Sequence, residues 1–289
     1  MIKHSELILN NDGSIFHLHL KPEHISDLII LVGDPARVDT VASFLSAIEF
    51  SIQNREFKTV TGWYNERKIT IISTGIGTDN IDIVLNELDA LANIDLEKRE
   101  VKKELSKLNI VRIGTSGGLQ PDLPVNSFVV STKSIGFDGM LNFYSNRENF
   151  SDLAFEKAFK LFTNWDKSLP TPYVVDASGY LLSKFADNKF KTGVTISAPG
   201  FYGPQGRVLR LFLAVPELNN QIEKFRFNNM KITNFEMESS AIYGLSRMLG
   251  HEALTICLII ANRVHHTANE NYRKKMKELI QVVLDRLTK

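Results

Sequence analysis

Short apolar runs alternate with amphipathic patterns along the whole chain. Residues 28–32 (LIILV) are continuously apolar, which is typical of a strand buried on both faces of a sheet. Residues 57–62 and 68–73 are two further strand-like runs, joined by a turn at 64–66. The remaining strands are predicted at residues 110–113, 128–131, 173–175, 192–196 and 254–260.

Helical periodicity is clearest after residue 77, where Thr78 or Asp79 can cap the first turn. The apolar positions that follow have the i, i+3, i+4, i+7 spacing of one helix face: Ile81, Val84, Leu85, Leu88 and Leu91. Further helices are predicted at residues 34–45, 97–108, 152–164, 238–249 and 272–287. The 97–108 helix is dense in charge, so we expect it to present a solvated face.

Buried strands that alternate with helices predict an α/β fold with a mostly parallel or mixed central sheet, covered by helices on both faces. No repeat, low-complexity tract or linker interrupts residues 1–289, so we predict a single domain. In such folds, ligands bind in the loops beyond the carboxyl ends of the strands.

Composition argues against several classes of protein. The 289 residues are 43% hydrophobic, and 34 basic and 33 acidic residues give a net charge of +1, unlike a nucleic-acid binder. The single cysteine, Cys257, cannot form an internal disulfide, and no Cys/His cluster has metal-ligand spacing. The N-terminus has no signal-type apolar segment, and no apolar stretch approaches the ~20 residues of a membrane span. We therefore expect a cytoplasmic protein without a membrane partner.

Glycine-bearing turns follow three of the predicted strands, at residues 33–37 (GDPAR), 74–78 (TGIGT) and 114–118 (GTSGG). Arg37 would lie in the first turn of a helix, where a cation is unfavourable unless it meets an anion. Arg112 lies inside an apolar strand and needs a paired charge, which is either a bound phosphate or a buried carboxylate. Together, the turns and arginines suit a tetrahedral oxyanion.

Two later segments are further candidates for a site. Residues 197–207 (SAPGFYGPQGR) are rich in glycine and proline and predict a shaped lid, in which Gln205 and Arg207 could contact a planar polar ring. An ordinary polar surface loop would have the same composition. Residues 234–241 (NFEMESSA) enter a helix, where Glu236 and Glu238 could equally serve to complement the helix dipole.

Taken in chain order, these segments resemble the nucleoside phosphorylase superfamily, and most closely its uridine phosphorylase branch. The resemblance implies a three-layer α/β fold with a central mixed sheet flanked by helices. It also implies a site shared across a homodimer interface, usually within a hexamer built as a trimer of dimers. The matching stretches are residues 16–18, 33–38, 55–57, 73–77, 112–117, 201–207 and 236–239.

The resemblance further implies a role for individual residues. Around the phosphate it places Gly33, Arg37, Arg55, Arg112 and Thr115, with Arg55 supplied by the neighbouring subunit. At the ribose it places His17, Ile76, Glu236, Met237 and Glu238, with His17 from the neighbour at the 5′-hydroxyl and Glu238 at the 2′- and 3′-hydroxyls. At the base it places Phe201, Gln205 and Arg207.

The implied reaction is the phosphorolysis of uridine to uracil and ribose 1-phosphate. Phosphate attacks an oxocarbenium-like sugar while Gln205 and Arg207 stabilise the charge on the departing base. The substrates are a nucleoside and phosphate, and no cofactor or metal is expected. Residues 77–80 (GTDN) replace the Gly-Gly-Pro-Ser usual in this branch, which argues against its potassium site. Residues 93–108 are longer than the family pattern, and we expect an added surface helix there.

Three alternatives remain open at this stage. A purine nucleoside phosphorylase is the nearest, although that branch uses an aspartate where this chain has Ala261 and Asn262. A nucleosidase that uses water would not need three arginines at the phosphate. A non-catalytic nucleoside-binding protein on the same fold is the third, because the lid residues after Arg207 differ from the family pattern.

Overall fold

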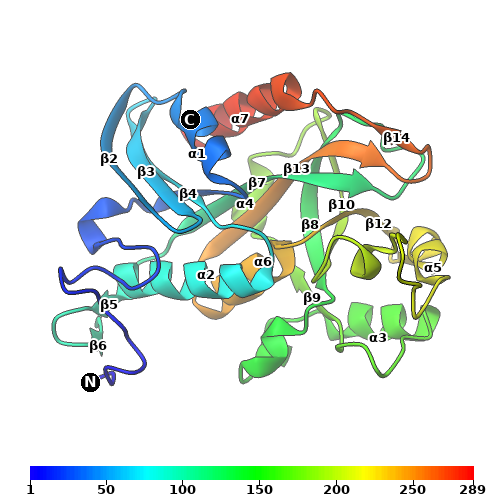
Figure 1. Ribbon diagram of the computed structural model, residues 1–289, viewed down its shortest axis with the longest axis horizontal. Coiled ribbons are helices and arrows are strands. Elements are labelled where there is room, and N and C mark those ends of the chain that lie inside the picture. The colour runs from blue at the N-terminus through cyan, green and yellow to red at the C-terminus, as the bar shows by residue number, and fades with distance from the viewer.

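The computed structural model describes residues 1–289, and its centre is a mixed sheet of twelve strands (Figure 1). The main path of the sheet runs β11-β12-β10-β8-β13-β7-β1-β4-β3-β2, with β9 paired to β8 and β14 to β13. The strands are β1 (Leu28–Val32), β2 (Ala47–Asn54), β3 (Phe57–Tyr64), β4 (Arg67–Ser73), β7 (Asn109–Gly118), β8 (Phe128–Gly136), β9 (Tyr173–Asp176), β10 (Phe190–Ser197), β11 (Arg226–Phe227), β12 (Met230–Glu236), β13 (Glu252–Asn262) and β14 (Thr267–Ala268). The central strands β1, β4, β7 and β13 are parallel, whereas β2, β3 and β4 pair antiparallel.

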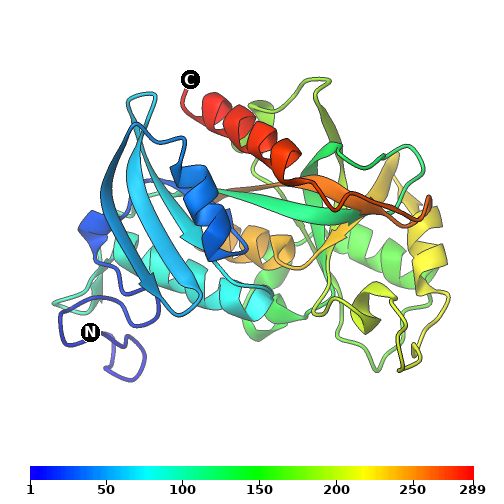
Figure 2. The same ribbon diagram turned by 45° about the horizontal axis from the view of Figure 1, so that its top comes forward.

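Helices cover both faces of this sheet, which gives three layers (Figures 1 and 2). The helices are α1 (Pro35–Ala42), α2 (Thr78–Asn93), α3 (Leu153–Phe162), α4 (Gly179–Ser183), α5 (Leu218–Lys224), α6 (Ser239–Met248) and α7 (Arg273–Leu287). Buried side chains of α2 and α6 form one core cluster with the sheet, and those of α1, α4 and α7 form another on the opposite face. A smaller cluster joins α3 and α5 to β10 and β12. The three-layer α/β fold expected from the sequence is confirmed.

The strands predicted from apolar runs are present because they are buried on both faces. All five residues of β1 are buried, and β13 is buried over most of its length. The sequence did not predict β2 or β12. In β2 exposed and half-buried positions alternate, so β2 has no continuous apolar run. In β12 the last five residues are buried, but its polar Asn234 interrupts the apolar pattern.

The prediction of a helix at residues 97–108 is wrong. Residues Ile94–Asp95 (β5) and Glu100–Val101 (β6) pair as a short antiparallel hairpin, and an irregular segment follows. Two apolar residues of this stretch, Val101 and Leu105, are more than 60% exposed, so a helix would have no apolar face to bury. The segment after the hairpin is instead fixed to the end of α2, because Asn93 Oδ1 accepts a hydrogen bond from the Ser106 amide at 2.7 Å.

Two details at the ends of elements also differ from the expectation. β7 continues through residues 114–118, which the sequence predicted as a turn after a short strand. The N-cap of α2 is Gly77, with φ at 101°, rather than Thr78 or Asp79. Glycine suits this position because residues with a Cβ rarely adopt a positive φ.

Candidate functional site

A cleft of about 350 Å³ lies where β1, β7 and β12 end. Leu31 of β1 pairs with Arg112 of β7, so the loop after β1 begins beside the glycine-rich half of β7. Ser197 at the end of β10 pairs with Glu236 at the end of β12, which brings the lid loop to the same edge of the sheet. Eleven of the thirteen predicted site residues line the cleft, and His17 and Arg55 do not.

The loop after β1 supplies an open backbone and the start of a helix. No atom lies within 4 Å of the position that a Cβ on Gly33 would occupy, so its backbone is accessible from the cleft. Asp34 caps α1 by accepting the Arg37 amide at 2.9 Å, and Arg37 Nη2 lies 3.4 Å from the Asp34 carboxylate. The free N–H groups at the start of a helix favour an anion at this point.

Arg112 is 5% exposed and lies between two carboxylates. Its Nη2 donates to Glu238, and its Nη1 lies 3.5 Å from Glu236 Oε2. Burial alone would lower the pKa of Arg112, but Glu238 and Glu236 outweigh burial and raise it. Of the two partners that the sequence left open for Arg112, the structure therefore supplies the carboxylates, while Arg112 Nε has no partner within the protein.

Gly114 makes room for this guanidinium. A Cβ on Gly114 would lie 1.9 Å from Arg112 Nη1, a distance that no non-bonded pair adopts. The glycine two residues after Arg112 is thus a steric requirement of the buried ion pairs.

Glu238 follows β12 and is almost fully buried. Its Oε1 accepts the Gly77 amide at 2.9 Å, and its Oε2 accepts from Arg112. Burial raises the pKa of Glu238 to about 6; the nearby Glu236 carboxylate adds to this rise, and Arg112 opposes it. Burial therefore moves the ionisation of the Glu238 carboxyl toward neutral pH.

The lid loop presents an aromatic ring and two polar side chains. The guanidinium of Arg207 stacks on Phe201, 3.7 Å from the ring centre, and donates to Gln205 Oε1 at 2.7 Å. Behind the loop, Arg263 donates to the backbone carbonyl of Gln205 and lies 5.1 Å from the Phe235 ring centre. Burial lowers the pKa of Arg263 to about 10, and the charge of Arg207 contributes to the same shift.

His17, which is half-buried, and Arg55, which is exposed, lie in adjoining segments apart from the cleft of their own chain. His17 Nδ1 is 2.7 Å from Glu87 of α2, and its backbone carbonyl accepts from Asn54 at 2.7 Å. Arg55 follows Asn54 in the exposed turn between β2 and β3, with φ at 54°.

Comparisons with known proteins identify the family. Residues 27–289 match the family model of the phosphorylase superfamily. The chain belongs to this superfamily. It is 28% identical to a uridine phosphorylase of Haemophilus influenzae, over 92% of this chain and 94% of the relative. It is 27% identical to a DeoD-type purine nucleoside phosphorylase of Listeria monocytogenes, over 93% and 97% of the two chains.

A solved structure is similar to this phosphorylase over nearly its whole length. The Trypanosoma brucei nucleoside phosphorylase, described as showing uridine phosphorylase activity, superimposes with a TM-score of 0.85 at 29% identity. The match covers 97% of this chain and 99% of the trypanosomal one. The resemblance drawn from the sequence is thus confirmed for family and fold, while the roles of individual residues stay predictions.

Several cleft residues of the phosphorylase were not predicted as site residues. Ser116, Phe235 and Ile260 line the cleft beside the predicted ones. Ser116 Oγ accepts from the Asn234 side chain at 3.0 Å, which links the glycine-rich half of β7 to β12. Ser116 and Asn234 are far apart in the sequence, and no sequence pattern predicts that they form a hydrogen bond. Only the structure shows it.

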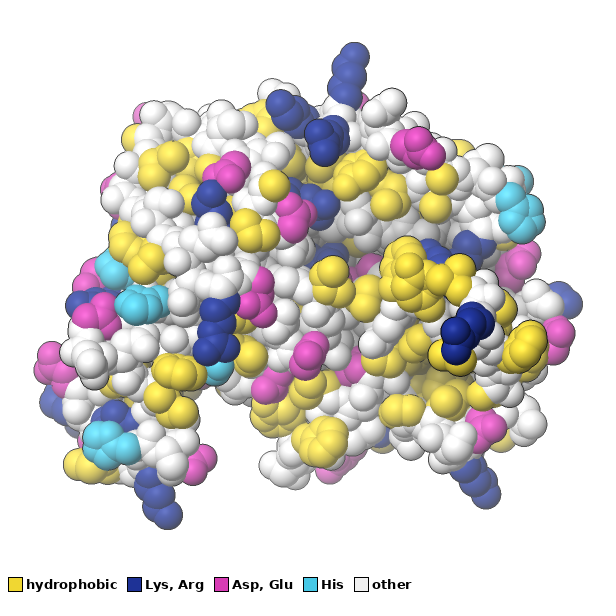
Figure 3. All heavy atoms as spheres, in the orientation of Figure 1, with side chains coloured by type: hydrophobic (Ala, Val, Ile, Leu, Met, Phe, Trp, Pro, Cys, Tyr) yellow, Lys and Arg dark blue, Asp and Glu magenta, His cyan; other side chains and the backbone are white.

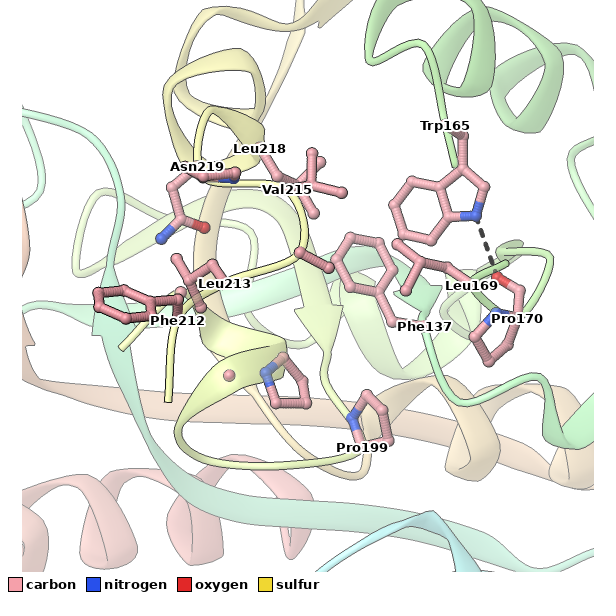
Figure 4. Close-up of a pocket in the computed structure, with 15 residues that line it drawn as sticks. Phe137, Trp165, Leu169, Pro170, Pro199, Phe212, Leu213, Val215, Leu218 and Asn219 are labelled. Atoms are coloured by element: carbon pink, nitrogen blue, oxygen red, sulfur yellow. Dashed lines mark hydrogen bonds between the residues drawn. The ribbon is translucent and has the colours of Figure 1, made fainter. Parts of the chain in front are cut away.

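A second pocket, of about 280 Å³, lies behind the lid loop and is mostly apolar (Figure 4). Phe137, Trp165 and Leu169 form one wall, and Pro204 of the lid belongs to the lining. Trp165 satisfies its ring N–H by donating to the Pro170 carbonyl at 3.1 Å. Phe212, which belongs to the lining, is 93% exposed, and hydrophobic side chains gather on the right-hand half of the face seen in Figure 3.

Two features are absent from the structure. No helix combines the length and apolar character that crossing a membrane requires. No three His, Cys, Asp or Glu side chains converge as a metal-binding group.

Replacing Gly114 with alanine should weaken phosphate binding. The new methyl group would collide with Arg112 Nη1, so the guanidinium must move. Loss of a hydrogen bond to a charged group costs about 1.5–3 kcal/mol, so we expect the phosphate KM to rise roughly 10- to 100-fold. Steady-state kinetics with varied phosphate measure this change.

The matched control is Gly179→Ala at the start of α4, where no atom lies within 4 Å of the added methyl group. We expect its phosphate KM to match that of the unaltered protein. An unchanged phosphate KM in Gly114→Ala would contradict the phosphate role that the sequence predicts for Arg112.

Proposed function

We propose that this phosphorylase cleaves uridine with inorganic phosphate, giving uracil and ribose 1-phosphate. The observation that carries the proposal is that one cleft combines Arg37 and Arg112 with the buried Glu238 and the Gln205–Arg207 pair. Two arginines suit a phosphate, a buried carboxylate suits ribose hydroxyls, and the amide and guanidinium suit a uracil ring. Relatives and a structural neighbour that are named as uridine phosphorylases support the same substrate.

In the proposed reaction, the protein positions phosphate and stabilises charge. A phosphate oxygen attacks the anomeric carbon as the bond from that carbon to the base nitrogen breaks, so the electron pair leaves with the base. The sugar passes through an oxocarbenium-like state, which the adjacent phosphate stabilises. Arg207 and Gln205 are preorganised beside Phe201 to stabilise the negative charge on the departing uracil, which then takes a proton.

The remaining groups complete a site that two subunits share. Thr115 and the Gly33 backbone join the arginines at the phosphate, and Met237 and Ile76 pack at the sugar. His17 and Arg55, which lie together outside the cleft, would complete the site of a neighbouring subunit. We therefore propose a homodimer as the smallest active unit, with a hexamer as a trimer of such dimers. The reaction requires no cofactor, and we place the protein in the cytoplasm.

Purine nucleosides are the second candidate substrates, because DeoD-type purine nucleoside phosphorylases are among the relatives. The structure favours pyrimidines over purines at Asn262. Its side-chain amide donates to the carbonyls of Gln120 and Leu123 at 2.9 and 2.8 Å, and its Oδ1 accepts from His265. Both N–H donors of the Asn262 side chain are thus engaged, and an amide offers no acidic proton to a purine ring.

A nucleoside panel, assayed with and without phosphate, tests the proposal. We expect uracil from uridine only when phosphate is present. Release of hypoxanthine or guanine instead would support the purine alternative, release without phosphate would support a nucleosidase, and binding without release would support a nucleoside-binding protein.

The pH dependence of uridine cleavage should follow Glu238. The ionised carboxylate is the form that accepts ribose hydroxyls and pairs with Arg112. Since the pKa of Glu238 is raised to about 6, activity should be present above this pH and fall as the pH drops through it. The measurement is kcat/KM for uridine between pH 5 and 8.

Glu238→Gln is the control, because it keeps the shape and removes the titration. Phosphate also titrates in this range, but its contribution is common to both proteins. We expect Glu238→Gln to have a lower kcat/KM for uridine. Its decline at low pH should lack the part that arises from protonation of Glu238. Identical acid limbs in the two proteins would show that another group is responsible.

Two inactive variants should restore activity to each other if the site is shared. Arg37→Ala removes a phosphate group from the cleft of its own chain, and Arg55→Ala removes one from the neighbour's cleft. In a mixed dimer, one site lacks both arginines and the other is intact. Random pairing makes half of the dimers mixed, so about a quarter of all sites should regain activity.

The measurement is the rate of uracil release after subunit exchange, with exchange followed by native mass spectrometry. Arg67→Ala, which alters an exposed ion pair with Asp27 on the surface, is the control for effects of losing an arginine. Complete exchange without recovery would reject a site that is shared through Arg55.

A further inference from the structure

Glu236 borders the cleft, but neither of its carboxylate oxygens is free. Oε1 accepts from the hydroxyls of Ser197 and Ser239, each at 2.6 Å. Oε2 accepts from the Glu238 amide at 3.0 Å, and the Ser239 amide is 3.0 Å from both oxygens. A carboxylate has about four lone-pair sites, and four donors of the protein already occupy them.

An ionised carboxylate can only accept, so both serine hydroxyls donate to Glu236, and the groups around them allow this. The Ser240 amide donates to Ser197 Oγ at 2.8 Å, so the Ser197 proton is available for Glu236. Ser134 Oγ lies 2.6 Å from Ser239 Oγ and can supply the proton that this hydroxyl accepts. Since the Glu236 side chain is only 1% exposed, a sugar hydroxyl would have to displace a buried donor.

Glu236 contacts Arg112 and the backbone of the turn that carries Glu238. Arg112 Nη1 lies 3.5 Å from Oε2, so Glu236 is beside one terminal nitrogen of the guanidinium while Glu238 accepts from the other, Nη2. The two amides that it accepts belong to Glu238 and to the first residue of α6. A negative charge at the N-terminus of a helix is also favourable for that helix.

We propose that Glu236 is a positioning residue, which fixes Arg112 and the turn that carries Glu238, and that it does not bind the sugar. This inference rests on the proposed function, in which Arg112 contacts phosphate and Glu238 contacts ribose. It replaces the role that the family resemblance implies for Glu236 among the ribose ligands. Glu236 thus acts on phosphate and on the sugar through its neighbours.

The test separates phosphate binding from sugar binding. Glu236→Asp keeps the charge but shortens the side chain by one methylene, so the carboxylate cannot reach Arg112 and the Glu238 and Ser239 amides at the same time. We expect phosphate binding, measured by calorimetry without nucleoside, to weaken about tenfold, as for loss of one charge-assisted contact. If Glu236 were a sugar ligand, phosphate binding would be unchanged and only the uridine KM would rise.

Glu236→Gln adds a second measurement, the pH dependence of kcat/KM, which would not change if Glu236 had only a structural role. The charged or titratable groups facing Glu238 are Arg112 and Cys257 from the sheet and Glu236 itself. Removing the negative charge at 236 should lower the pKa of Glu238, so the acid limb of kcat/KM should move to lower pH. An unmoved limb would contradict the coupling of Glu236 to Glu238.

Ser239→Ala covers the case in which Glu236→Asp does not fold. It leaves the Glu236 charge in place and removes one donor, so a positioning role predicts a lower kcat and weaker phosphate binding. A sugar ligand would instead gain a free lone pair, and kcat would not fall. The control is Ser246→Ala, a fully buried serine on the same helix whose hydroxyl has no partner.

These outcomes are distinct from a failure of the proposed function. Phosphate binding without nucleoside does not depend on which base the enzyme accepts. If the unaltered protein binds phosphate but releases no uracil, the proposed substrate is wrong while the positioning role can still be measured.

Discussion

The burial of Arg112 between Glu236 and Glu238 is the constraint on which the rest of the site depends. Arg112 sits in β7, between β1 and β13 at the centre of the sheet, where a lone charge would carry a large desolvation penalty. Its two carboxylate partners come from the β12–α6 turn. The ion pairs therefore bind the central strand to the turn that faces it. Gly114 is the third requirement, because any side chain there would displace the guanidinium.

A buried polar layer extends from these ion pairs into the helix layer. Ser197 and Ser239 join Glu236 to the ends of β10 and the start of α6. Nearby, Asp138 accepts from the Tyr173 and Ser240 hydroxyls at 2.8 and 2.9 Å, and burial raises the pKa of its carboxyl. Buried polar groups that are fully satisfied specify one arrangement, because any shift leaves a donor or acceptor unpaired. The site is thus held by directional bonds on the side away from the cleft.

The sequence predicted the fold well where burial alone decides it, as in β1 and α2, whose apolar patterns match the buried faces. It failed at residues 97–108, where helical composition had no surface to pack against. The family motifs predicted most of the residues that line the cleft, but they did not predict the hydrogen bonds and ion pairs that these residues make. Whether Arg112 faces phosphate or a carboxylate depends on the position of β12, a strand that the sequence did not predict. The saturation of Glu236 depends on Ser197, 39 residues away, and no local pattern records that contact.

The charges of the cleft bear on the proposal that a second subunit completes the site. The ionisable side chains lining the cleft are Arg37, Arg112 and Arg207, together with Asp34, Glu236 and Glu238. When all are ionised, the three arginines and three carboxylates cancel. Arg112 is surrounded by two carboxylates, and Arg37 is paired with Asp34.

A phosphate dianion entering this cleft would therefore meet hydrogen-bond donors but no net positive charge. In the proposed shared site, Arg55 of a neighbouring subunit, which lies in an exposed turn, would supply a further cation and restore the electrostatic attraction.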